Sequence, residues 1–478
     1  MSMLSVFWRE YLQKWHLKYG KLAILLSIVV LFLTLILYLV IVPIVEEAVI
    51  TRSTEKIPLE YKKNSITYLT RTIYKAREDL TSPNSLDDKV VTLNAGLYVT
   101  AKLVHSIGPS LVSLLNSAAQ VIFPNSSTIF ASNKVRDFLF DGITLHCSEA
   151  ARTTASMICN ALPSHAPPNI RQKENSKDFL YSFFAHKNYT LQGPYEVDRG
   201  LKDVRRAGLL LSKHGTNQLN VWQPGSQCDK LHGTDALTFA PFISKSDLIN
   251  VYISDVCQVL TLRFDEETKS KGISVQKFSV TSSWLENDQL VSENSCYCDS
   301  SNPIFCNESG LRDVSNCMKV PVVISYPHFY HADEKFRTYA SGMIPDSGSH
   351  NSEIFIHPQS GIPVIAAKRV QFNIPITRIK GFHMTENLTE GLFPLLWISE
   401  EIELTDDVLA KFKLPLLIQA MINTTCLVLM SVCLVIIVYL LIALLCFSTP
   451  QVGAEDKAPP ERRPPPPTLV LANSLYPH

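Results

Sequence analysis

Two long apolar runs constrain this chain more than any other feature. Residues 22–45 are 24 consecutive residues without a formal charge, and residues 426–447 form a second uncharged run near the other end. About 20 apolar residues suffice to cross a bilayer as a helix. A cleaved signal peptide is the alternative for the first run, but its apolar core is too long and no small-residue cleavage site follows it. We therefore expect transmembrane helices at 22–45 and, with a lead-in, at 414–447.

The charges in front of the first run predict its orientation. Segment 1–21 carries four basic residues next to the run against one acid, and the cytoplasmic flanks of membrane spans are enriched in Lys and Arg. This segment is therefore predicted to be cytoplasmic, and two spans return the Pro-rich tail, 448–478, to the same side. Loop 46–413 is then extracellular or lumenal. The basic residues are Arg9, Lys14, Lys18 and Lys21, and the acid is Glu10.

A block of six cysteines lies within the predicted extracellular loop, between Cys228 and Cys317. In an oxidising compartment such a block favours disulfides over zinc or redox chemistry. Six cysteines allow many pairings, and their spacing alone does not choose among them. Four Asn-x-Ser/Thr sequons on the same side predict N-glycosylation. Their asparagines are Asn125, Asn188, Asn307 and Asn387.

Composition and motifs argue against several classes of function. Lys plus Arg equals Asp plus Glu at 44 each, so no basic field would recruit nucleic acid. The sequence contains no phosphate-binding glycine loop, nucleophile elbow, zinc-protease helix or Cys-x-x-Cys pair. The most suggestive histidine, His328 beside Tyr326 and Phe329, is interpreted as structural. We expect no enzymatic activity and no cofactor.

The first part of the extracellular loop shows a helical pattern. Segment 51–85 is polar and poorly patterned, but from Asp87 to Phe123 apolar residues recur at spacings of three and four. A break at Gly108-Pro109 divides this stretch into two amphipathic helices. These helices are predicted to form a small helical cap.

Short strands are predicted after Phe123. The clearest hairpin joins 353–357 to 364–374, where apolar residues alternate with Gln371 and Asn373. Segment 322–326 is a further strand candidate. The extracellular part is therefore predicted to be mainly antiparallel β structure with a helical insertion at about 87–123.

The cysteine block resembles the class B scavenger receptor superfamily, a group of two-span lipid receptors. The resemblance covers about 87–447, and within the superfamily it is strongest to the insect sensory neuron membrane proteins. The superfamily motifs are Cys228-x-x-x-x-Gly233-Thr234-Asp235, Phe239-x-Pro241-Phe242, Ser254-Asp255-x-Cys257, Cys296-Tyr297-Cys298, Asp313-x-Ser315-x-Cys317, Pro327-His328-Phe329 and Pro358-x-Ser360-Gly361. The motifs shared with the sensory neuron proteins run from Val135 to Gly142, Phe184 to Asn188, Arg199 to Gly200 and Lys368 to Asn373.

This resemblance implies an α+β membrane protein. Two transmembrane helices would flank a large extracellular β-barrel-like domain, with a helical apex and an apolar tunnel that leads towards the membrane. It further implies a plasma-membrane receptor or carrier, in sensory cilia, for hydrophobic ligands such as fatty-acid-derived molecules or pheromones. The ligand would pass to the membrane or to an odorant receptor. Candidate contacts on the apex helices are Leu111, Leu114 and Leu115. The alternative is a scavenger, adhesion or lysosomal trafficking receptor that binds lipoprotein or protein partners.

The resemblance also implies a disulfide pattern. Carried over by position, it pairs Cys228 with Cys296, Cys257 with Cys317, and Cys298 with Cys306. Outside the block, Cys147 and Cys159 are close in sequence and on the same side, and are predicted to pair with each other. The cysteines of the second apolar run, Cys426, Cys433 and Cys446, are expected to stay reduced.

This chain departs from the family pattern in two respects. The family has a long segment directly after the first span, and roughly 70 of its residues have no counterpart between Thr51 and Ile66 here. Gly193-Pro194-Tyr195 repeats a motif of that segment at a different place. In addition, some relatives carry lysine on the apex helices, whereas the second predicted helix, 111–123, has none.

Overall fold

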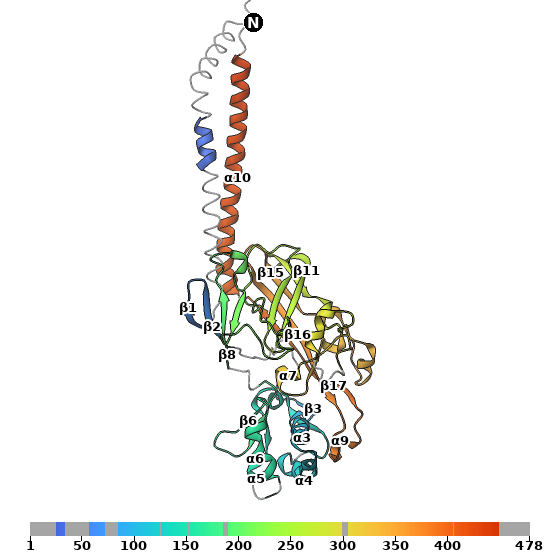
Figure 1. The fold of residues 1–478 in the computed structure, drawn as a ribbon. Helices are drawn as coiled ribbons and strands as arrows, with labels where there is room; N and C mark the ends of the chain where they lie inside the picture. Colours follow the sequence, from blue (N-terminus) through green and yellow to red (C-terminus); the bar gives the residue numbers. More distant parts are fainter. Residues whose placement is uncertain are drawn as a thin grey trace, which may run out of the picture. The chain divides into compact units, whose positions relative to one another are not determined.

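The computed structural model describes residues 25–33, 57–71, 85–124, 126–150, 153, 155–184, 190–298, 305–404 and 406–448. The chain divides into two compact units, which are described separately. One unit comprises Met1–Ile44 with Ile418–His478, and the other is Val45–Leu417. Figure 1 shows the ribbon with its elements labelled.

The apolar unit contains one helix that is long and apolar enough to cross a membrane within the described part of the chain. Helix α10 spans Asp406–Ser448, and its apolar window, Ala420–Ala443, has a mean hydropathy of 3.1 over 24 residues. Of the first apolar run, only residues 25–33 are described, and they are helical. The rest of that run, the N-terminal segment 1–21 and the tail beyond Ser448 lie outside the described residues.

The core of Val45–Leu417 is an eight-stranded antiparallel sheet with strand order β10-β11-β12-β15-β16-β14-β13, with β17 also paired to β16. The 15-residue strand β16 organises it, because it pairs with β14, β15 and β17. The strands are β10 (Ile249–Ile253), β11 (Gln258–Ser270), β12 (Ile273–Val280), β13 (Leu311–Asp313), β14 (Val323–Ser325), β15 (Glu353–His357), β16 (Ile362–Ile376) and β17 (Gly391–Glu403). The predicted hairpin at 353–374 and the predicted strand at 322–326 are confirmed as β15–β16 and β14.

A second sheet has the order β1-β2-β8-β9, in β1 (Ile57–Tyr61), β2 (Ser65–Arg71), β8 (Leu191–Asp198) and β9 (Leu210–Lys213). The hairpin β1–β2 lies in a segment where the sequence showed no clear pattern. Tyr68 of β2 holds this hairpin in place: it is fully buried, its ring lies tilted against that of Tyr195, and its hydroxyl donates a hydrogen bond to Asp235. Outside the helical part, the described strands of this unit thus form two antiparallel sheets.

The helical part contains α3 (Ala95–Ile107), the 3₁₀ turn η1 (Pro109–Leu111), α4 (Val112–Ile122), α5 (Cys147–Ala150) and α6 (Ser156–His165). The prediction that the helix begins near Asp87 is wrong. Lys89–Leu93 is strand β3, paired with β4 (Phe130–Lys134), because its Val-Val-Thr run is β-branched and favours extended backbone. Helix α3 begins only after Asn94, whose side chain accepts the backbone N–H of Leu97 at 3.0 Å.

The predicted sequence of short strands after Phe123 is also incomplete. The structure adds α5 and α6 there, next to a small sheet of order β5-β7-β6, formed by β5 (Ile143–Leu145), β7 (Phe179–Tyr181) and β6 (Ile170–Gln172). Helix α6 carries an internal proline, Pro163, which weakens the helical signal in the sequence.

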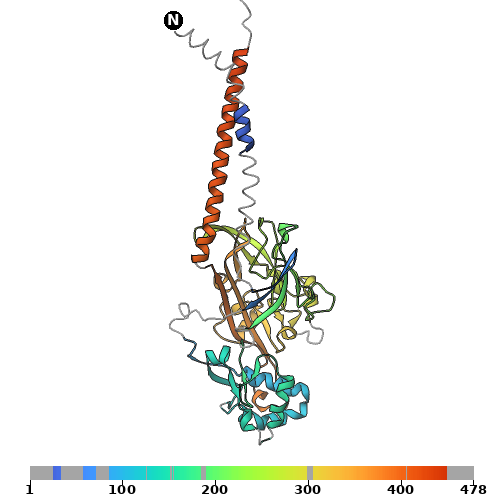
Figure 2. The same cartoon turned by 90° about the vertical axis from the view of Figure 1, so that its left-hand side faces the viewer.

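The helices and the main sheet share one hydrophobic core. Leu97 on α3 and Leu115 on α4 belong to the same buried cluster as Phe372 on β16. The ring centroids of Phe183 and Phe372 are 5.1 Å apart, edge to face. The hydroxyl of Tyr98 on α3 also donates to the carbonyl of Pro375 at 2.9 Å. The helical part is therefore fixed to the end of β16, an arrangement that the view in Figure 2 also shows.

Candidate apolar ligand site

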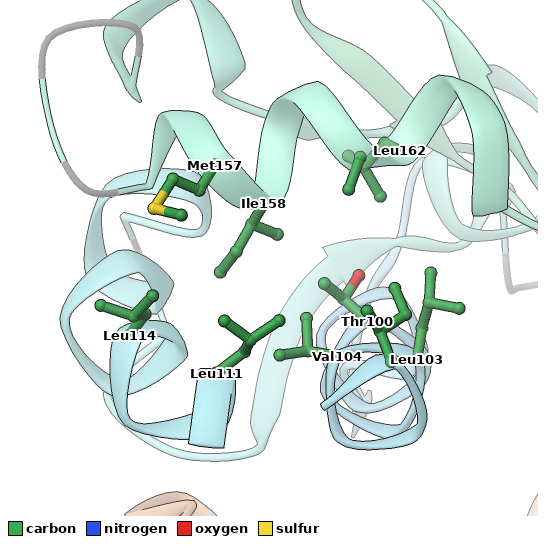
Figure 3. Close-up of a pocket in the computed structure, with 10 residues that line it drawn as sticks. Thr100, Leu103, Val104, Leu111, Leu114, Met157, Ile158 and Leu162 are labelled. Carbon is green, nitrogen blue, oxygen red and sulfur yellow. The ribbon is translucent and has the colours of Figure 1, made fainter. Parts of the chain in front are cut away.

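An apolar cavity of about 110 Å³ lies among the helices of the Val45–Leu417 unit (Figure 3). Helix α3 contributes one wall, the η1–α4 segment a second and α6 a third. The volume is comparable to that of the engineered apolar cavity of about 150 Å³ that binds benzene. Its lining residues are Thr100, Leu103, Val104, Ile107, Leu111, Leu114, Met157, Ile158, Ala161 and Leu162.

The chain turn at Gly108-Pro109 brings the first two walls together. The backbone N–H of Gly108 donates to the carbonyl of Val104 at 3.0 Å and ends α3, and Pro109 begins the 3₁₀ turn that leads into α4. On α4, Val112 and Leu115 face the core. Residues on the adjoining part of the surface, Leu111 and Leu114, therefore face the cavity.

A disulfide holds the third wall. Cys147 on α5 is bonded to Cys159 on α6, with their Cα atoms 5.6 Å apart. The segment before α5 is in turn attached to the end of α4, because the backbone N–H of His146 donates to the carbonyl of Ile122 at 2.9 Å. The cross-link thus connects α6 to the helix on the opposite side of the cavity.

The lining side chains of the cavity offer no free hydrogen-bond donor and no charge to a ligand. Thr100 is the one lining residue with a polar side chain, and its hydroxyl donates to the carbonyl of Gly96 at 2.7 Å within α3. The other nine lining residues are apolar. Recognition in this cavity would therefore depend on shape and on burial of hydrocarbon, not on charge.

The side chain of Lys102, on α3, makes its contacts outside the cavity lining. Nζ of Lys102 is bonded to the hydroxyl of Thr377, at the end of the main sheet, and lies 5.8 Å from the ring centroid of Tyr98. Partial burial lowers the pKa of Lys102.

Two residues at the edge of the cavity are exposed although they are apolar. Ile107 is 46% exposed and Met157 is 59% exposed. Leu111 and Leu114 are half-buried. Exposed apolar side chains next to an apolar cavity are typical of the entrance to a binding site for hydrophobic molecules or of a protein contact surface.

The structure brings together two of the three leucines that were expected to contact ligand. Leu111 and Leu114 line the cavity, whereas Leu115 is fully buried in the shared core one position further round α4. The α6 wall was missed. Its lining residues, Met157, Ile158, Ala161 and Leu162, recur at helical spacing, and this signal could have revealed an amphipathic helix despite Pro163.

The cysteine block is joined in the same three pairs that the resemblance implies. The Cα atoms are 5.8 Å apart in Cys228–Cys296, 5.9 Å in Cys257–Cys317 and 5.4 Å in Cys298–Cys306. Cys426 and Cys433 are free. In the part of the chain that the structure describes, no group of three or more His, Cys, Asp or Glu residues is arranged to hold a metal ion.

The Lys368–Asn373 motif and the Ser254–Cys257 motif meet at a half-buried cluster of one lysine and two carboxylates. Nζ of Lys368, on β16, lies 2.6 Å from Oδ2 of Asp255 and 2.5 Å from Oε2 of Glu400 on β17. Burial lowers the pKa of Lys368, but the two carboxylates outweigh it and the net shift is upward. The lysine is therefore charged and ties the cysteine block to the longest strands, which is a structural role.

Two of the four predicted glycosylation sites are described. Asn307 and Asn387 are both exposed, as attachment of a glycan requires. Asn125 and Asn188 lie outside the described residues.

Comparison with known families shows which family this chain belongs to. The model of the CD36 family matches residues 49–444, which covers all the described sheets, the helices between them, the cysteine block and most of α10. This chain belongs to the CD36 family. It is therefore a member of the membrane-associated class B scavenger receptors, a family of receptors and not of enzymes.

Similar proteins of known name within this family are sensory neuron membrane proteins of insects. The chain is 29% identical to sensory neuron membrane protein 2 of Heliothis virescens over 362 residues, which is 74% of this chain and 69% of the relative. It is 30% identical to sensory neuron membrane protein 1 of Ostrinia nubilalis over 371 residues, 76% and 68% of the two chains. With sensory neuron membrane protein 1 of Apis mellifera it shares 31% identity over 328 residues, 68% and 61%.

Proposed function

We propose that this CD36-family chain is a cell-surface receptor that captures lipid-like ligands by inserting their hydrocarbon part into the apolar cavity among α3, α4 and α6. The observation that carries the proposal is the lining itself. Nine apolar side chains and one threonine whose hydroxyl is already bonded surround about 110 Å³. Each ligand methylene buried there contributes about 0.8 kcal/mol.

The chemistry of the lining restricts the ligand class. With no ionisable side chain in the lining, the cavity suits a fatty-acid-derived chain or a pheromone of similar hydrocarbon character, held by its apolar end. A carboxylate or phosphate at the other end would remain at the exposed edge near Ile107 and Met157. The names of the sensory neuron relatives support a sensory setting for such a ligand.

We further propose that captured ligand passes through an apolar tunnel in the β domain towards the membrane, or to an odorant receptor. Two transmembrane helices, with both termini cytoplasmic, would hold the extracellular domain beside the bilayer of a sensory cilium. The family match and the apolar window of α10 support the membrane anchoring, and the tunnel is carried over from the family resemblance.

A pair of matched variants tests capture. Leu114→Glu places a carboxylate in the cavity, and Ser117→Glu places the same carboxylate three residues further along α4, at an exposed position outside the lining. Uptake of a fluorescent long-chain lipid by cells should fall at least about tenfold for Leu114→Glu, because burying an unpaired charge is costly. It should stay unchanged for Ser117→Glu at equal surface expression. Equal uptake by both variants would exclude this cavity as the capture site.

The exposed apolar pair Ile107 and Met157 favours one alternative function. These side chains could instead contact a protein or lipoprotein, as an adhesion or lysosomal trafficking receptor requires. A lipid-exchange assay on the purified full-length protein separates the two. Exchange that is lost in Leu114→Glu supports capture, whereas an absence of exchange in the parent protein supports the alternative.

A further inference from the structure

The connection between β8 and β9 carries exposed cations that the proposed ligand site does not use. Within residues 199–206, four basic side chains are exposed to solvent. Two apolar side chains between them are exposed as well, Leu201 at 56% and Val204 at 40%. Exposed cations and exposed apolar side chains therefore lie next to each other within one short segment, as in segments that lie on a membrane surface. The basic residues are Arg199, Lys202, Arg205 and Arg206.

Hydrogen bonds fix the backbone of this connection, so its side chains project outward from a defined base. The carboxylate of Asp198 accepts the N–H of Gly200 at 2.9 Å and Nε of Arg206 at 2.8 Å. The carboxylate of Asp203 accepts the N–H of Arg205 at 3.0 Å. Gly200 has φ +72°, and a Cβ there would lie 2.8 Å from the Cβ of Ala207, so the turn requires glycine.

The turn between β1 and β2 adds to the same cluster. The backbone N–H of Arg199 donates to the carbonyl of Asn64 at 3.0 Å, and its Nη1 donates to the carbonyl of Lys62 at 3.3 Å. Lys62 is paired with Glu196 at 3.0 Å. The basic loop is defined here as residues 199–206 together with Lys63. Among the described residues, four of its cations have no carboxylate within ion-pair distance: Lys63, Arg199, Lys202 and Arg205.

A series of close contacts links the basic loop to the first turns of α10. A Cβ at Gly208, which follows the loop, would lie 2.7 Å from the carbonyl oxygen of Thr238. The next residue, Phe239, is in turn packed so closely on Gly361 that a Cβ there would clash with it. Ile362 then packs in one cluster with Leu409 of α10. The apolar window of the same helix begins at Ala420, eleven residues after Leu409.

We propose that the basic loop docks on the anionic headgroups of the bilayer that holds α10. Guanidinium and ammonium groups pair with lipid phosphates and with the carboxylate of phosphatidylserine. Leu201 and Val204, placed between these cations, would enter the interfacial region of the bilayer, as the apolar residues of membrane-surface segments do. A soluble polyanion would contact the cations but would leave these two apolar side chains in water. This inference is independent of ligand capture in the cavity.

Hydrogen exchange on the full-length protein in nanodiscs tests the proposal. The nanodiscs contain phosphatidylcholine alone, or phosphatidylcholine mixed with phosphatidylserine, and the readout is the exchange rate of backbone amides in the peptide that covers 199–209. Exchange there should be slower by at least about fivefold with phosphatidylserine, because surface contact suppresses local opening. The double variant Lys202→Glu, Arg205→Glu should lose this difference.

A matched pair of charge reversals controls for net charge. Lys173→Glu with Lys177→Glu changes the charge equally in the exposed β6–β7 turn, and should leave the lipid-dependent protection at 199–209 intact. Equal exchange in both lipids for the parent protein overturns the proposal. So does protection by added heparin in phosphatidylcholine nanodiscs without protection by phosphatidylserine, since that result assigns the basic loop to a sulfated polymer.

Discussion

The side-chain amide of Asn373 on β16 donates a hydrogen bond to the hydroxyl of Ser325 on β14 at 3.0 Å. The same amide nitrogen donates to the carbonyl of Val323 at 3.0 Å, and the carbonyl oxygen of Asn373 accepts the amide of Gln371 at 2.8 Å. Asn373 is fully buried and Gln371 is 1% exposed. The polar side of the β16 alternation is therefore an internal hydrogen-bond network between two strands, not a solvent-facing surface.

Replacing Asn373 by Ala should destabilise the fold by roughly 2–4 kcal/mol, because it leaves several buried polar partners unsatisfied. Ser325→Ala removes one acceptor and should cost less, about 1–2 kcal/mol. The double variant should be less destabilised than the sum of the two by about 1 kcal/mol, since both delete the same bond. Thermal unfolding of the detergent-solubilised protein measures all three. Strict additivity would contradict a direct coupling between these residues.

Removing the disulfide that holds α6 should weaken both stability and ligand capture. Cys147 and Cys159 are 12 residues apart, and a loop of this size contributes about 3 kcal/mol in the chain-entropy model. Cys147→Ser with Cys159→Ser should lower the unfolding temperature and reduce lipid uptake, because the third wall of the cavity loses its cross-link. Cys433→Ser, which removes a free thiol in α10, is the control and should change neither.

The complete disulfide pattern is tested by peptide mapping under non-reducing conditions. We expect linked peptides for Cys147–Cys159, Cys228–Cys296, Cys257–Cys317 and Cys298–Cys306, with free thiols at Cys426 and Cys433. A peptide that joins Cys296 to Cys317 would contradict both the structure and the pairing implied by the resemblance.

Stability should fall as the medium is acidified below neutral pH. Burial lowers the pKa of His357 from 6.5 to about 4. Between these values the unfolded chain binds a proton that the folded chain does not, so the free energy of unfolding decreases as pH falls from about 6.5 to about 4. This histidine alone should account for up to about 3 kcal/mol of the loss.

Denaturant unfolding at a series of pH values measures this dependence. His357→Gln should flatten the curve between about pH 6.5 and pH 4, because glutamine does not titrate. His165→Gln, at an exposed position near the end of α6, should leave its slope unchanged. A parent curve without a slope in this window would contradict the buried neutral state of His357.

The proposed topology predicts the outcome of protease protection in sealed microsomes. With two spans and a basic N-terminal flank, added protease should remove epitope tags at both termini and leave the loop 46–413 intact. A protected N-terminal tag would show that the first apolar run does not cross the bilayer in the expected direction.

Local sequence patterns predicted the segments whose apolar residues fit only one type of secondary structure. The hairpin β15–β16 follows from its apolar alternation and the strand β14 from a short run bounded by prolines, and the apolar window of α10 follows from its uncharged length. The sequence did not show that Val90 and Val91 belong to a strand, because apolar residues there also fit the helical period that continues into α3. That conflict is resolved only by pairing with β4, some 40 residues away in the sequence.

The cavity was predictable on one side only. The amphipathic pattern predicted that Leu111 and Leu114 line the cavity. The same pattern also includes Leu115, whose side chain is buried in the core because of how α4 packs. The opposite wall depends on α6, whose propensity is weakened by Pro163 and whose position is fixed by a disulfide and not by local sequence. Long-range partners of this kind are absent from any local pattern.

The hydroxyl of Tyr98 has a consequence for how the cavity can adapt to ligands of different size. It donates to the carbonyl of Pro375 and accepts the backbone N–H of Thr377, each at 2.9 Å. Two hydrogen bonds thus hold α3 against the end of the longest strand. Displacing this helix would break two hydrogen bonds, each worth about 1 kcal/mol. A ligand bulkier than the cavity must therefore make room by shifting α4 or α6. The range of ligand sizes that the cavity accepts therefore depends on how far α4 and α6 can shift, because α3 stays fixed.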